Sequence, residues 1–433
     1  MASAYLRVRR AVVNAITETS AELLDAAARA ARIAAAQLAR AGSAPKDAAL
    51  RYSASAIRAH ARHIRAANEL DLAAAPGLSP AYRDRLTLTP SRIEAMALGL
   101  EEVAALPDPV GRVLAEWTRP NGLRFQRVAQ PLGVIGMIFE SRPNVTADAG
   151  ALCLKAGSAV LLRGGSESAR SARAIAECLR HGLSEAGLPE AAIQLAPTQD
   201  RAFVGAMLRA SGLIDLIIPR GGKGLVTRVL EEARVPVLAH AEGLCHTYVH
   251  AAANPAMARA ILLDAKLRRT GVCGATETLL MDAALAESLL PLMVADLAQE
   301  GCRFHADARA RAICPELPEA TDAHFATEWL DAVLNIGVVD GVEGALSHIR
   351  RFGSEHTEAI ITADEATAEA FLAGIDSAVG LWNASTQFCD GGEFGFGAEI
   401  GIATGRLHAR GPVGLEQLCT FRYRVIGNGQ VRG

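Results

Sequence analysis

An alternation of strand patterns and helix patterns, which runs from Val134 to Trp382, constrains the fold most strongly. A first run of short apolar strands is expected at residues 134–139, 159–162, 193–195, 216–218 and 235–239. A second run, which starts after Glu242, is expected at residues 247–250, 278–281, 333–339, 358–362 and 378–382. Because helical patterns separate these strands, each run indicates a mostly parallel sheet that is covered on both faces. The sequence therefore predicts two α/β domains of similar size, with a ligand cleft between them.

The segments outside this alternation predict an N-terminal group of helices and a small β element. Residues 18–105 follow a helical pattern, and Thr19 and Glu22 have the spacing of a capping box at the start of the first helix. Residues 117–131 are polar and alternating, which favours a hairpin. A Gly-rich tail ends in a strand pattern at 420–426.

Composition excludes several classes of protein. A chain of 433 residues that is 50% hydrophobic and 21% charged can bury large cores, and its net charge of −3 gives no reason to expect nucleic acid as a partner. Its eight cysteines are scattered without a CxxC pair, which indicates a reducing compartment and no zinc ribbon. No apolar run approaches the roughly 18 residues that a membrane helix needs, so no membrane partner is expected.

The N-terminus is basic. Arg7, Arg9 and Arg10 precede the first acidic residue, Glu18. Organelle transit peptides have this composition, and so does a short basic extension on a cytoplasmic protein. The second interpretation is preferred, so the protein is expected to be cytoplasmic.

Cys273 is the candidate nucleophile. It follows Arg268, Arg269 and Thr270 at the end of a helical pattern, and small residues flank it before the next strand. Nearby positive charge favours the thiolate, which is the nucleophilic form of cysteine. A cysteine in this setting can hold an acyl group as a thioester, whereas the structural alternative is a buried and inert core residue.

Two strand-to-helix turns have the chemistry of phosphate-binding loops. The first turn contains Arg163, Gly164, Gly165 and Ser166. The second turn contains Pro219, Arg220, Gly221 and Gly222. In each, glycines allow backbone N–H groups to face a ligand at a helix N-terminus, with an arginine beside them. Neither turn matches the GxGxxG or the Walker pattern, and the alternative for each is a tight turn with a solvated arginine.

Two polar clusters flank the predicted strands. Arg142 and Asn144 follow the strand at 134–139, at the strand end where α/β proteins place ligands. The Asn144 amide could donate to an oxyanion, or it could cap the next helix. Glu242 could be a general base, a cofactor contact or a surface acid, and the neighbouring His246 is weak evidence for a site.

Eight ordered segments resemble the gamma-glutamyl phosphate reductases (glutamate-5-semialdehyde dehydrogenases), a branch of the aldehyde dehydrogenase superfamily. The segments are FESRPNVT (139–146), LLRGGSE (161–167), PRGGKGL (219–225), AEGLCHTYV (241–249), GVCGATETLL (271–280), FGSEHTEAI (352–360), DGGEFGFGAEIGI (390–402) and RLHARGPVGL (406–415). The resemblance covers nearly the whole chain from about residue 18. The last two segments are specific to this branch.

The resemblance implies an aldehyde dehydrogenase-like α/β fold with parallel-rich sheets and a small β oligomerisation arm. A cofactor-binding domain is expected over residues 1–240 and a catalytic domain over 241–385. Residues 386–433 are expected to return to the cofactor domain and to add an oligomerisation strand beside a hairpin at 117–131. A homo-oligomer, either a dimer or a tetramer, is therefore expected.

The resemblance also implies a reaction. NADPH would reduce L-glutamyl 5-phosphate to L-glutamate 5-semialdehyde with release of phosphate, which is the second step of proline biosynthesis from glutamate. Cys273 would form the thioester, and its backbone N–H and Asn144 would bind the oxyanion. A functional link to glutamate 5-kinase follows. Since no water is activated in this direction, no strong general base is required, which agrees with the lack of an obvious histidine partner for Cys273 in the sequence.

The expected ligand contacts follow from the same segments. NADP(H) is expected at Arg163, Gly164, Gly165, Ser166, Pro219, Arg220, Gly221, Gly222 and Glu242. The substrate is expected at Arg142, Arg268, Arg269 and Thr270, and no metal is expected. Arg163 and Arg220 are the candidates for contact with a 2′-phosphate.

The chain departs from the family pattern around the nucleophile. Gly274 stands where Asn is usual, Gln387 stands where Arg is common, and Arg268-Arg269-Thr270 replaces Gln-Arg-Pro. At least one of these two arginines is expected to bind the leaving phosphate, because a cation replaces the family glutamine. The alternative is a pair of cations that interact with the dipole at a helix C-terminus.

Two other functions are open at this point. A phosphate-independent aldehyde dehydrogenase that acts on a small aldehyde would use Glu242 as its base. A non-catalytic member would serve as a binding or scaffolding subunit with an unreactive Cys273.

Overall fold

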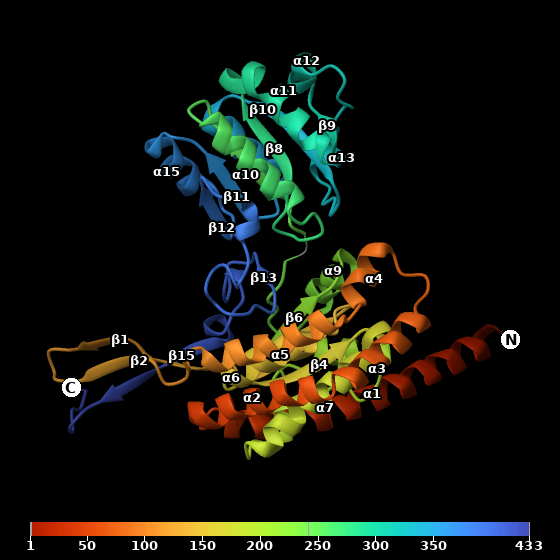
Figure 1. The fold of residues 1–433 in the computed structure, drawn as a ribbon. Helices are drawn as coiled ribbons and strands as arrows, with labels where there is room; N and C mark the ends of the chain where they lie inside the picture. The colour runs from red at the N-terminus through yellow and green to blue at the C-terminus, as the bar shows by residue number, and fades with distance from the viewer. Residues whose placement is uncertain (1, 241, 433) are drawn as a thin grey trace. The chain divides into compact units, whose positions relative to one another are not determined.

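The computed structural model describes residues 2–240 and 242–432, and the chain divides into two compact units (Figure 1). Unit 1 comprises Met1–Ala239, Phe396–Gly401 and Val413–Gly433. Unit 2 comprises His240–Gly395 and Ile402–Pro412. The functions expected of the predicted domains stay predictions. The side chains of the basic N-terminal segment lie outside those described. Within the described residues, no helix is long and apolar enough to cross a membrane.

Unit 1 is built on a four-stranded parallel sheet in the order β5-β4-β3-β6. Its strands are β3 (Val134–Phe139), β4 (Ala159–Gly164), β5 (Ile193–Leu195) and β6 (Leu216–Arg220). The chain passes from β3 to β4 and β5 on one side and then returns to place β6 on the other side of β3. The register pairs Phe139 with both Gly164 and Arg220, so the loops after these strands lie at one edge. Such a reversal of strand order is where open α/β sheets bind ligands.

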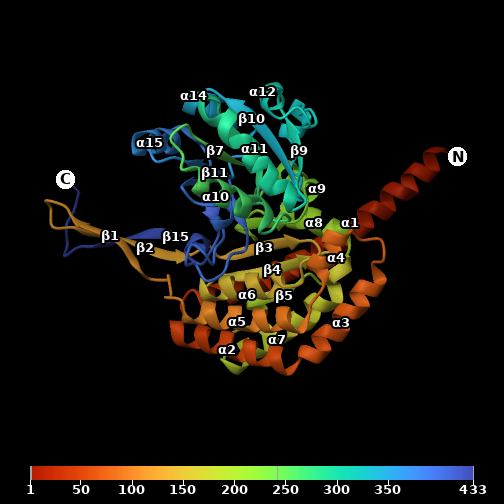
Figure 2. The same ribbon diagram turned by 45° about the horizontal axis from the view of Figure 1, so that its top comes forward.

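Helices cover both faces of this sheet, which explains why its strands are almost entirely apolar. The helices that follow the strands are α6 (Val145–Lys155), α7 (Ala169–Glu185), α8 (Arg201–Leu208) and α9 (Lys223–Glu232). The N-terminal helices are α1 (Ala2–Leu38), α2 (Ser43–Ala59), α3 (Ala61–Ala74), α4 (Pro80–Leu86) and α5 (Pro90–Ala105). Helices α1, α8 and α9 share one core cluster with the sheet. Helices α2, α3 and α5 pack with α6 and α7 on the other side (Figure 2).

Two expectations for unit 1 were wrong in detail. The first helix begins at Ala2, so Thr19 and Glu22 lie inside it and do not form its start. No proline or glycine interrupts residues 2–38, so nothing in that stretch ends the helix. The strand expected at 235–239 is reduced to a single bridge between Val237 and Ile217, because Pro236 has no N–H to donate to a ladder.

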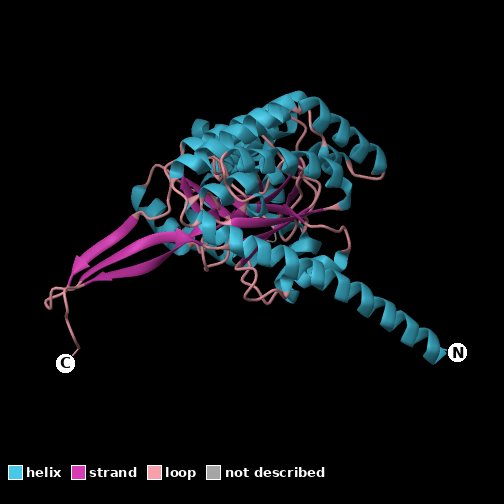
Figure 3. Ribbon diagram, turned by 90° about the horizontal axis from the view of Figure 1, so that it is seen from below, coloured by secondary structure: helices cyan, strands magenta, loops and turns pink. Residues whose placement is uncertain are grey.

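A three-stranded antiparallel sheet completes unit 1 and stands apart from its helices (Figure 3). Its strands are β1 (Val113–Thr118), β2 (Arg124–Pro131) and β15 (Cys419–Ile426), in the order β1-β2-β15. Trp117 stacks on Phe125 with ring centroids 5.6 Å apart, and Tyr423 meets the edge of Trp117. The exposure of Trp117 and Tyr423 is compatible with burial by a partner, and the oligomerisation role of this sheet stays a prediction.

Unit 2 is built on a six-stranded parallel sheet in the order β12-β11-β7-β8-β10-β9. Its strands are β7 (Cys245–Val249), β8 (Thr276–Asp282), β9 (Arg303–Ala306), β10 (Val333–Val339), β11 (Thr357–Ile361) and β12 (Val379–Trp382). Alternate residues of β8 enter different cores: Leu279 packs in the cluster with α10 and α11, and Leu280 packs in the cluster with α14 and α15. The sheet is therefore buried on both faces.

The remaining elements of unit 2 are short or helical. Its helices are α10 (Pro255–Leu267), α11 (Ala283–Gln299), α12 (Ala308–Ile313), α13 (Asp322–Phe325), α14 (Gly341–Phe352) and α15 (Glu365–Gly374). A two-stranded antiparallel pair joins β13 (Ile402–Ala403) and β14 (Gly411–Pro412).

Two helical glycines in unit 1 give a test of its packing. A Cβ on Gly182 of α7 would lie 2.4 Å from the Ala49 carbonyl oxygen of α2, whereas a Cβ on Gly99 of α5 would meet nothing within 4 Å. We expect Gly182→Ala to lower the free energy of unfolding by about 1–3 kcal/mol, because the two helices must separate. Gly99→Ala is the matched control and should raise it by about 0.5–1 kcal/mol through helix propensity. Denaturant unfolding followed by circular dichroism measures both, and equal effects would contradict the close helix contact.

Candidate active site

The Cys273 loop joins α10 to β8 and is approached closely by a second backbone segment. Cys273 is partly buried. A Cβ on Gly243 would lie 2.2 Å from the Cys273 carbonyl oxygen, so only glycine allows the segment before β7 to lie against the loop. The Cys245 thiol donates to the same carbonyl oxygen at 3.1 Å. The backbone of the Cys273 loop is therefore held by Gly243, which precedes β7, and by the thiol of Cys245 in β7.

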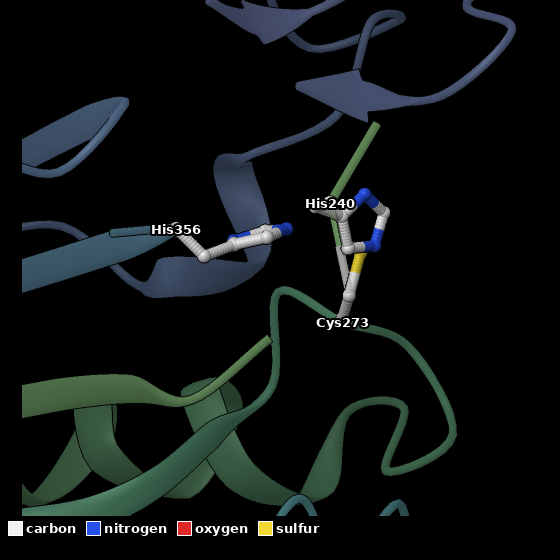
Figure 4. A group of neighbouring side chains, drawn as sticks. All are labelled: His240, Cys273 and His356. Carbon is white, nitrogen blue, oxygen red and sulfur yellow. The ribbon is translucent and has the colours of Figure 1, made fainter. Parts of the chain in front are cut away.

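Two histidines stand beside the sulfur. One ligand atom from each of His240, Cys273 and His356 lies within 4.8 Å of the others, and both rings point towards the sulfur (Figure 4). His240 Nδ1 donates to the Ile402 carbonyl oxygen at 2.7 Å. His356 is fully buried, and its Nδ1 lies 2.9 Å from Thr357 Oγ1. Each ring is thus held through Nδ1.

The histidines set the charge of the nucleophile. Burial by itself raises the pKa of the Cys273 thiol, but the charges of His356 and His240 outweigh it and lower that pKa well below the ordinary value. Burial raises the pKa of the other cysteines for which a shift is resolved, namely Cys153, Cys178, Cys245, Cys302, Cys314 and Cys419. Among the cysteines with a resolved pKa shift, Cys273 is therefore the one whose thiolate form is favoured.

This pairing differs from the sequence-based expectation, which found no histidine partner for Cys273. His240, Cys273 and His356 precede β7, β8 and β11, which are neighbours in a parallel sheet, so the three residues meet at one edge. The order of strands in a sheet is not visible in sequence spacing. His246, which the sequence did single out, is buried inside β7 with Nδ1 2.9 Å from Glu358 Oε2, and it takes no part in the cluster.

A carboxylate that the sequence did not indicate lies near the cluster. Glu328 Oε1 accepts a hydrogen bond of 2.9 Å from the Gly243 N–H. Burial raises the pKa of Glu328, and the negative charges of Cys273 and Glu242 raise it further, against the Gly243 hydrogen bond and His240. Glu242 is half-buried at the start of this segment, while the preceding Ala241 lies outside the described residues. Its role as cofactor contact stays a prediction.

The residues that depart from the family pattern surround the other side of the loop. Arg268 and Arg269 are exposed just beyond the end of α10, and Thr270 is half-buried. The Gln387 amide donates to the carbonyl oxygens of Ala265 and Arg269, both at 3.1 Å, so it anchors this helix end.

Gly274 lies against the turn at Thr386–Phe388. A Cβ on Gly274 would lie 3.1 Å from the Thr386 carbonyl oxygen, which is a tight contact with backbone. Thr386 Oγ1 is in turn 2.9 Å from Thr276 Oγ1. The Cys273 loop therefore contacts Thr386 at two positions, Gly274 and Thr276, which flank Ala275.

In unit 1, the two turns with phosphate-type chemistry lie at the same edge of the sheet, on either side of β3. A Cβ on Gly164 would lie 2.9 Å from the Phe139 ring, and one on Gly221 would lie 2.5 Å from Glu140 Oε2. A side chain at Gly164 would collide with the Phe139 ring, whereas one at Gly221 would displace the flexible ends of Glu140 and Leu225. The Gly222 N–H at the start of α9 donates to the same carboxylate at 3.2 Å.

The two candidate arginines differ. Arg163 is buried, and its guanidinium donates to the carbonyl oxygens of Gly164 and Gln199. Arg220 is half-buried with Glu399 3.8 Å away. Arg163 therefore stabilises its own turn, and Arg220 is the more accessible cation; the contact of either one with a cofactor stays a prediction.

The loop after β3 carries Asn144 and a strained backbone. The Asn144 side chain does not cap α6; its Nδ2 donates to Asp148 Oδ2 at 2.9 Å. Burial raises the pKa of Asp148 to about 6, against the Asn144 hydrogen bond and the charge of Arg220. Ser141 adopts a positive φ of 49° and is held by Glu167, which accepts from its N–H at 2.7 Å. Arg142 is half-buried in the same loop.

Comparisons with known proteins agree with this architecture. A model of the aldehyde dehydrogenase family matches residues 5–303. The gamma-glutamyl phosphate reductase of Gluconobacter oxydans is 68% identical over 412 residues, which cover 95% of this chain and 96% of that protein. The crystal structure of gamma-glutamyl phosphate reductase from Thermotoga maritima superposes with a TM-score of 0.92 at 40% identity, covering 95% of this chain and all of that one (100%).

A more distant structure shares the fold alone. An engineered glycolyl-CoA reductase with bound NADP+ is 15% identical, with a TM-score of 0.68 over 93% of this chain and 96% of that one. The family model and the curated relative cover most of the sequence. The chain therefore belongs to the aldehyde dehydrogenase family, in its branch of gamma-glutamyl phosphate reductases.

Proposed function

We propose that this protein reduces L-glutamyl 5-phosphate to L-glutamate 5-semialdehyde with release of phosphate, and that it acts in the cytoplasm in the second step of proline biosynthesis. The observation that carries the proposal is the histidine-paired thiolate of Cys273 in a chain that is 68% identical to a curated gamma-glutamyl phosphate reductase. Attack on an acyl phosphate is favoured by a thiolate, and the lowered pKa of Cys273 increases the thiolate fraction.

The covalent steps centre on the sulfur. The Cys273 thiolate attacks the carbonyl carbon of the acyl phosphate, a C–S bond forms, and the C–O bond to phosphate breaks. NADP(H), which would be held by the glycine turns of unit 1, would supply a hydride to the thioester carbonyl carbon and so give a thiohemiacetal anion. The C–S bond then breaks, and the sulfur leaves as a thiolate that His240 and His356 stabilise. A lowered pKa of Cys273 favours both the first and the last step, because it increases the thiolate fraction that attacks and makes the sulfur a better leaving group.

The oxyanion formed in these steps needs donors. We assign the Cys273 backbone N–H and the Asn144 amide to this role. One Asn144 N–H is held by Asp148 at 2.9 Å, which orients the amide. Its second N–H is the one that would donate to the oxygen.

The cofactor is proposed to be NADP(H), held by the two glycine turns of unit 1. The reversal of strand order beside β3, the closeness that Gly164 and Gly221 allow, and the N-terminus of α9 after Gly222 fit a dinucleotide phosphate. Arg220 supplies positive charge there. The NADP+ in the engineered glycolyl-CoA reductase, which has the same fold, is compatible with this assignment.

The wider assembly is also a proposal. The exposed aromatic residues of the three-stranded sheet support a homo-oligomer formed through that sheet. Acyl phosphates hydrolyse readily, which favours a functional link to the kinase that forms the substrate, glutamate 5-kinase.

The reaction itself can be tested in reverse. Purified protein given NADP+, glutamate 5-semialdehyde and phosphate should produce NADPH at a rate that depends on phosphate. Cys273→Ser should lower this rate at least about a thousandfold because no thioester can form, whereas Cys153→Ser, a buried control, should not. Aldehyde oxidation without phosphate would instead support a hydrolytic dehydrogenase with Glu242 as base.

The exposed arginines beyond α10 predict a phosphate contact. We expect the double variant Arg268→Ala/Arg269→Ala to raise KM for phosphate about tenfold or more, because a charged hydrogen bond to phosphate is lost. Arg259→Ala is the matched control, since Arg259 is on the same helix and pairs with Asp296 at 2.6 Å. If both variants keep the wild-type KM for phosphate, Arg268 and Arg269 do not bind phosphate and interact only with the dipole at the C-terminus of α10.

The pKa of Cys273 predicts an alkylation profile. Since the pKa of the folded thiol is lowered well below its ordinary value, the pH at which its reaction with iodoacetamide falls to half of the plateau rate should lie well below that of an unperturbed thiol. In His356→Gln the pKa should rise, and the rate at pH 7 should fall about tenfold for each unit by which the pKa exceeds the pH. Mass spectrometry of the Cys273 peptide measures the rate, and identical profiles would remove His356 from this role.

A further inference from the structure

The cluster that ionises the nucleophile also has the composition of a transition-metal site. We propose that His240, Cys273 and His356 bind a Zn²⁺ ion, and that the metal-bound protein is reversibly inactive because the metal occupies the nucleophile. The binding part of this proposal stands on the geometry alone, and the loss of activity rests on the proposed function. Thiolate sulfur with two imidazole nitrogens is a donor set that favours Zn²⁺ over Mg²⁺ or Ca²⁺.

The spacing of the donors suits the ion. Their ligand atoms lie within 4.8 Å of one another. A tetrahedral Zn²⁺ with Zn–S near 2.3 Å and Zn–N near 2.0–2.1 Å separates its ligands by about 3.4–3.6 Å. Rotation of the side chains by a small amount closes that difference. Three protein ligands leave a fourth position for water, as in open zinc sites.

The two rings are already oriented for coordination. His240 Nδ1 is committed to the Ile402 carbonyl oxygen, and His356 Nδ1 lies beside Thr357 Oγ1. Such contacts of the far nitrogen are those that orient metal-bound histidines. His356 is fully buried, yet its Nε2 has no hydrogen-bond partner among the described residues. A buried nitrogen without a partner is costly, and a metal ion would satisfy it.

Electrostatics favour the same ion. The carboxyl group of Glu328 interacts electrostatically with Cys273 and His240, so a cation in the cluster would have an acidic neighbour. In the metal-bound protein, the positive charge beside the Cys273 sulfur would be that of Zn²⁺, because imidazole binds a metal in its neutral form.

Co²⁺ is a spectroscopic probe for this site in the full-length reduced protein in metal-free buffer. We expect one equivalent of Co²⁺ to produce a thiolate-to-cobalt absorption band in the near ultraviolet, and Zn²⁺ to displace it. Cys273→Ser should abolish the band. His356→Ala and His356→Gln should each weaken binding about tenfold or more, since even the loss of an outer contact to a metal ligand costs that much. The exposed His63→Ala variant is the control and should bind like wild type.

The outcomes separate the proposal from the proposed function. A band that persists in Cys273→Ser, or wild-type affinity in folded His356 variants, would overturn the site. Where the band forms as expected, Zn²⁺ should inhibit the phosphate-dependent reaction and a chelator should restore it. Full activity of the zinc-loaded protein would overturn the inhibitory part. A metal-free protein with no activity would count against the proposed reaction, while the absorption band would still decide whether the site exists.

Discussion

The chemistry of this protein depends on a sulfur that keeps its negative charge while it is partly withdrawn from water. Withdrawal alone would favour the neutral thiol, and every other cysteine with a resolved shift in the structure follows that rule. Cys273 departs from it because the sheet of unit 2 brings His240 and His356 to the edge from which its own loop emerges. The parallel order β11-β7-β8 is thus as necessary to the site as the cysteine itself.

Much of the fold was visible in the sequence. Strands Val134–Phe139, Ile193–Leu195 and Val333–Val339 were predicted at their observed bounds, because continuous apolar runs between helical patterns have few other interpretations. The strand expected at 235–239 was wrong because one proline outweighed the apolar pattern around it. The aldehyde dehydrogenase fold itself was confirmed.

The site was visible only in part. Cys273 and the two glycine turns could be found because small residues next to charged ones mark places where backbone and ligand come close. His240 and His356 could not be found, since their relation to Cys273 is set by strand order and not by distance along the chain. Gly243 carried a signal that was missed: it is a glycine two residues before a buried strand, where a side chain would collide with the Cys273 loop.

The low pKa of Cys273 has a consequence for the lifetime of the protein. Peroxides oxidise thiolates far faster than thiols, so among the cysteines with resolved shifts the oxidative damage should begin at one sulfur. The others are protonated in the core and are chemically quiet. An oxidised population would therefore keep its fold and its stability while losing its nucleophile, and a measurement of folded protein would overstate the amount that can still react.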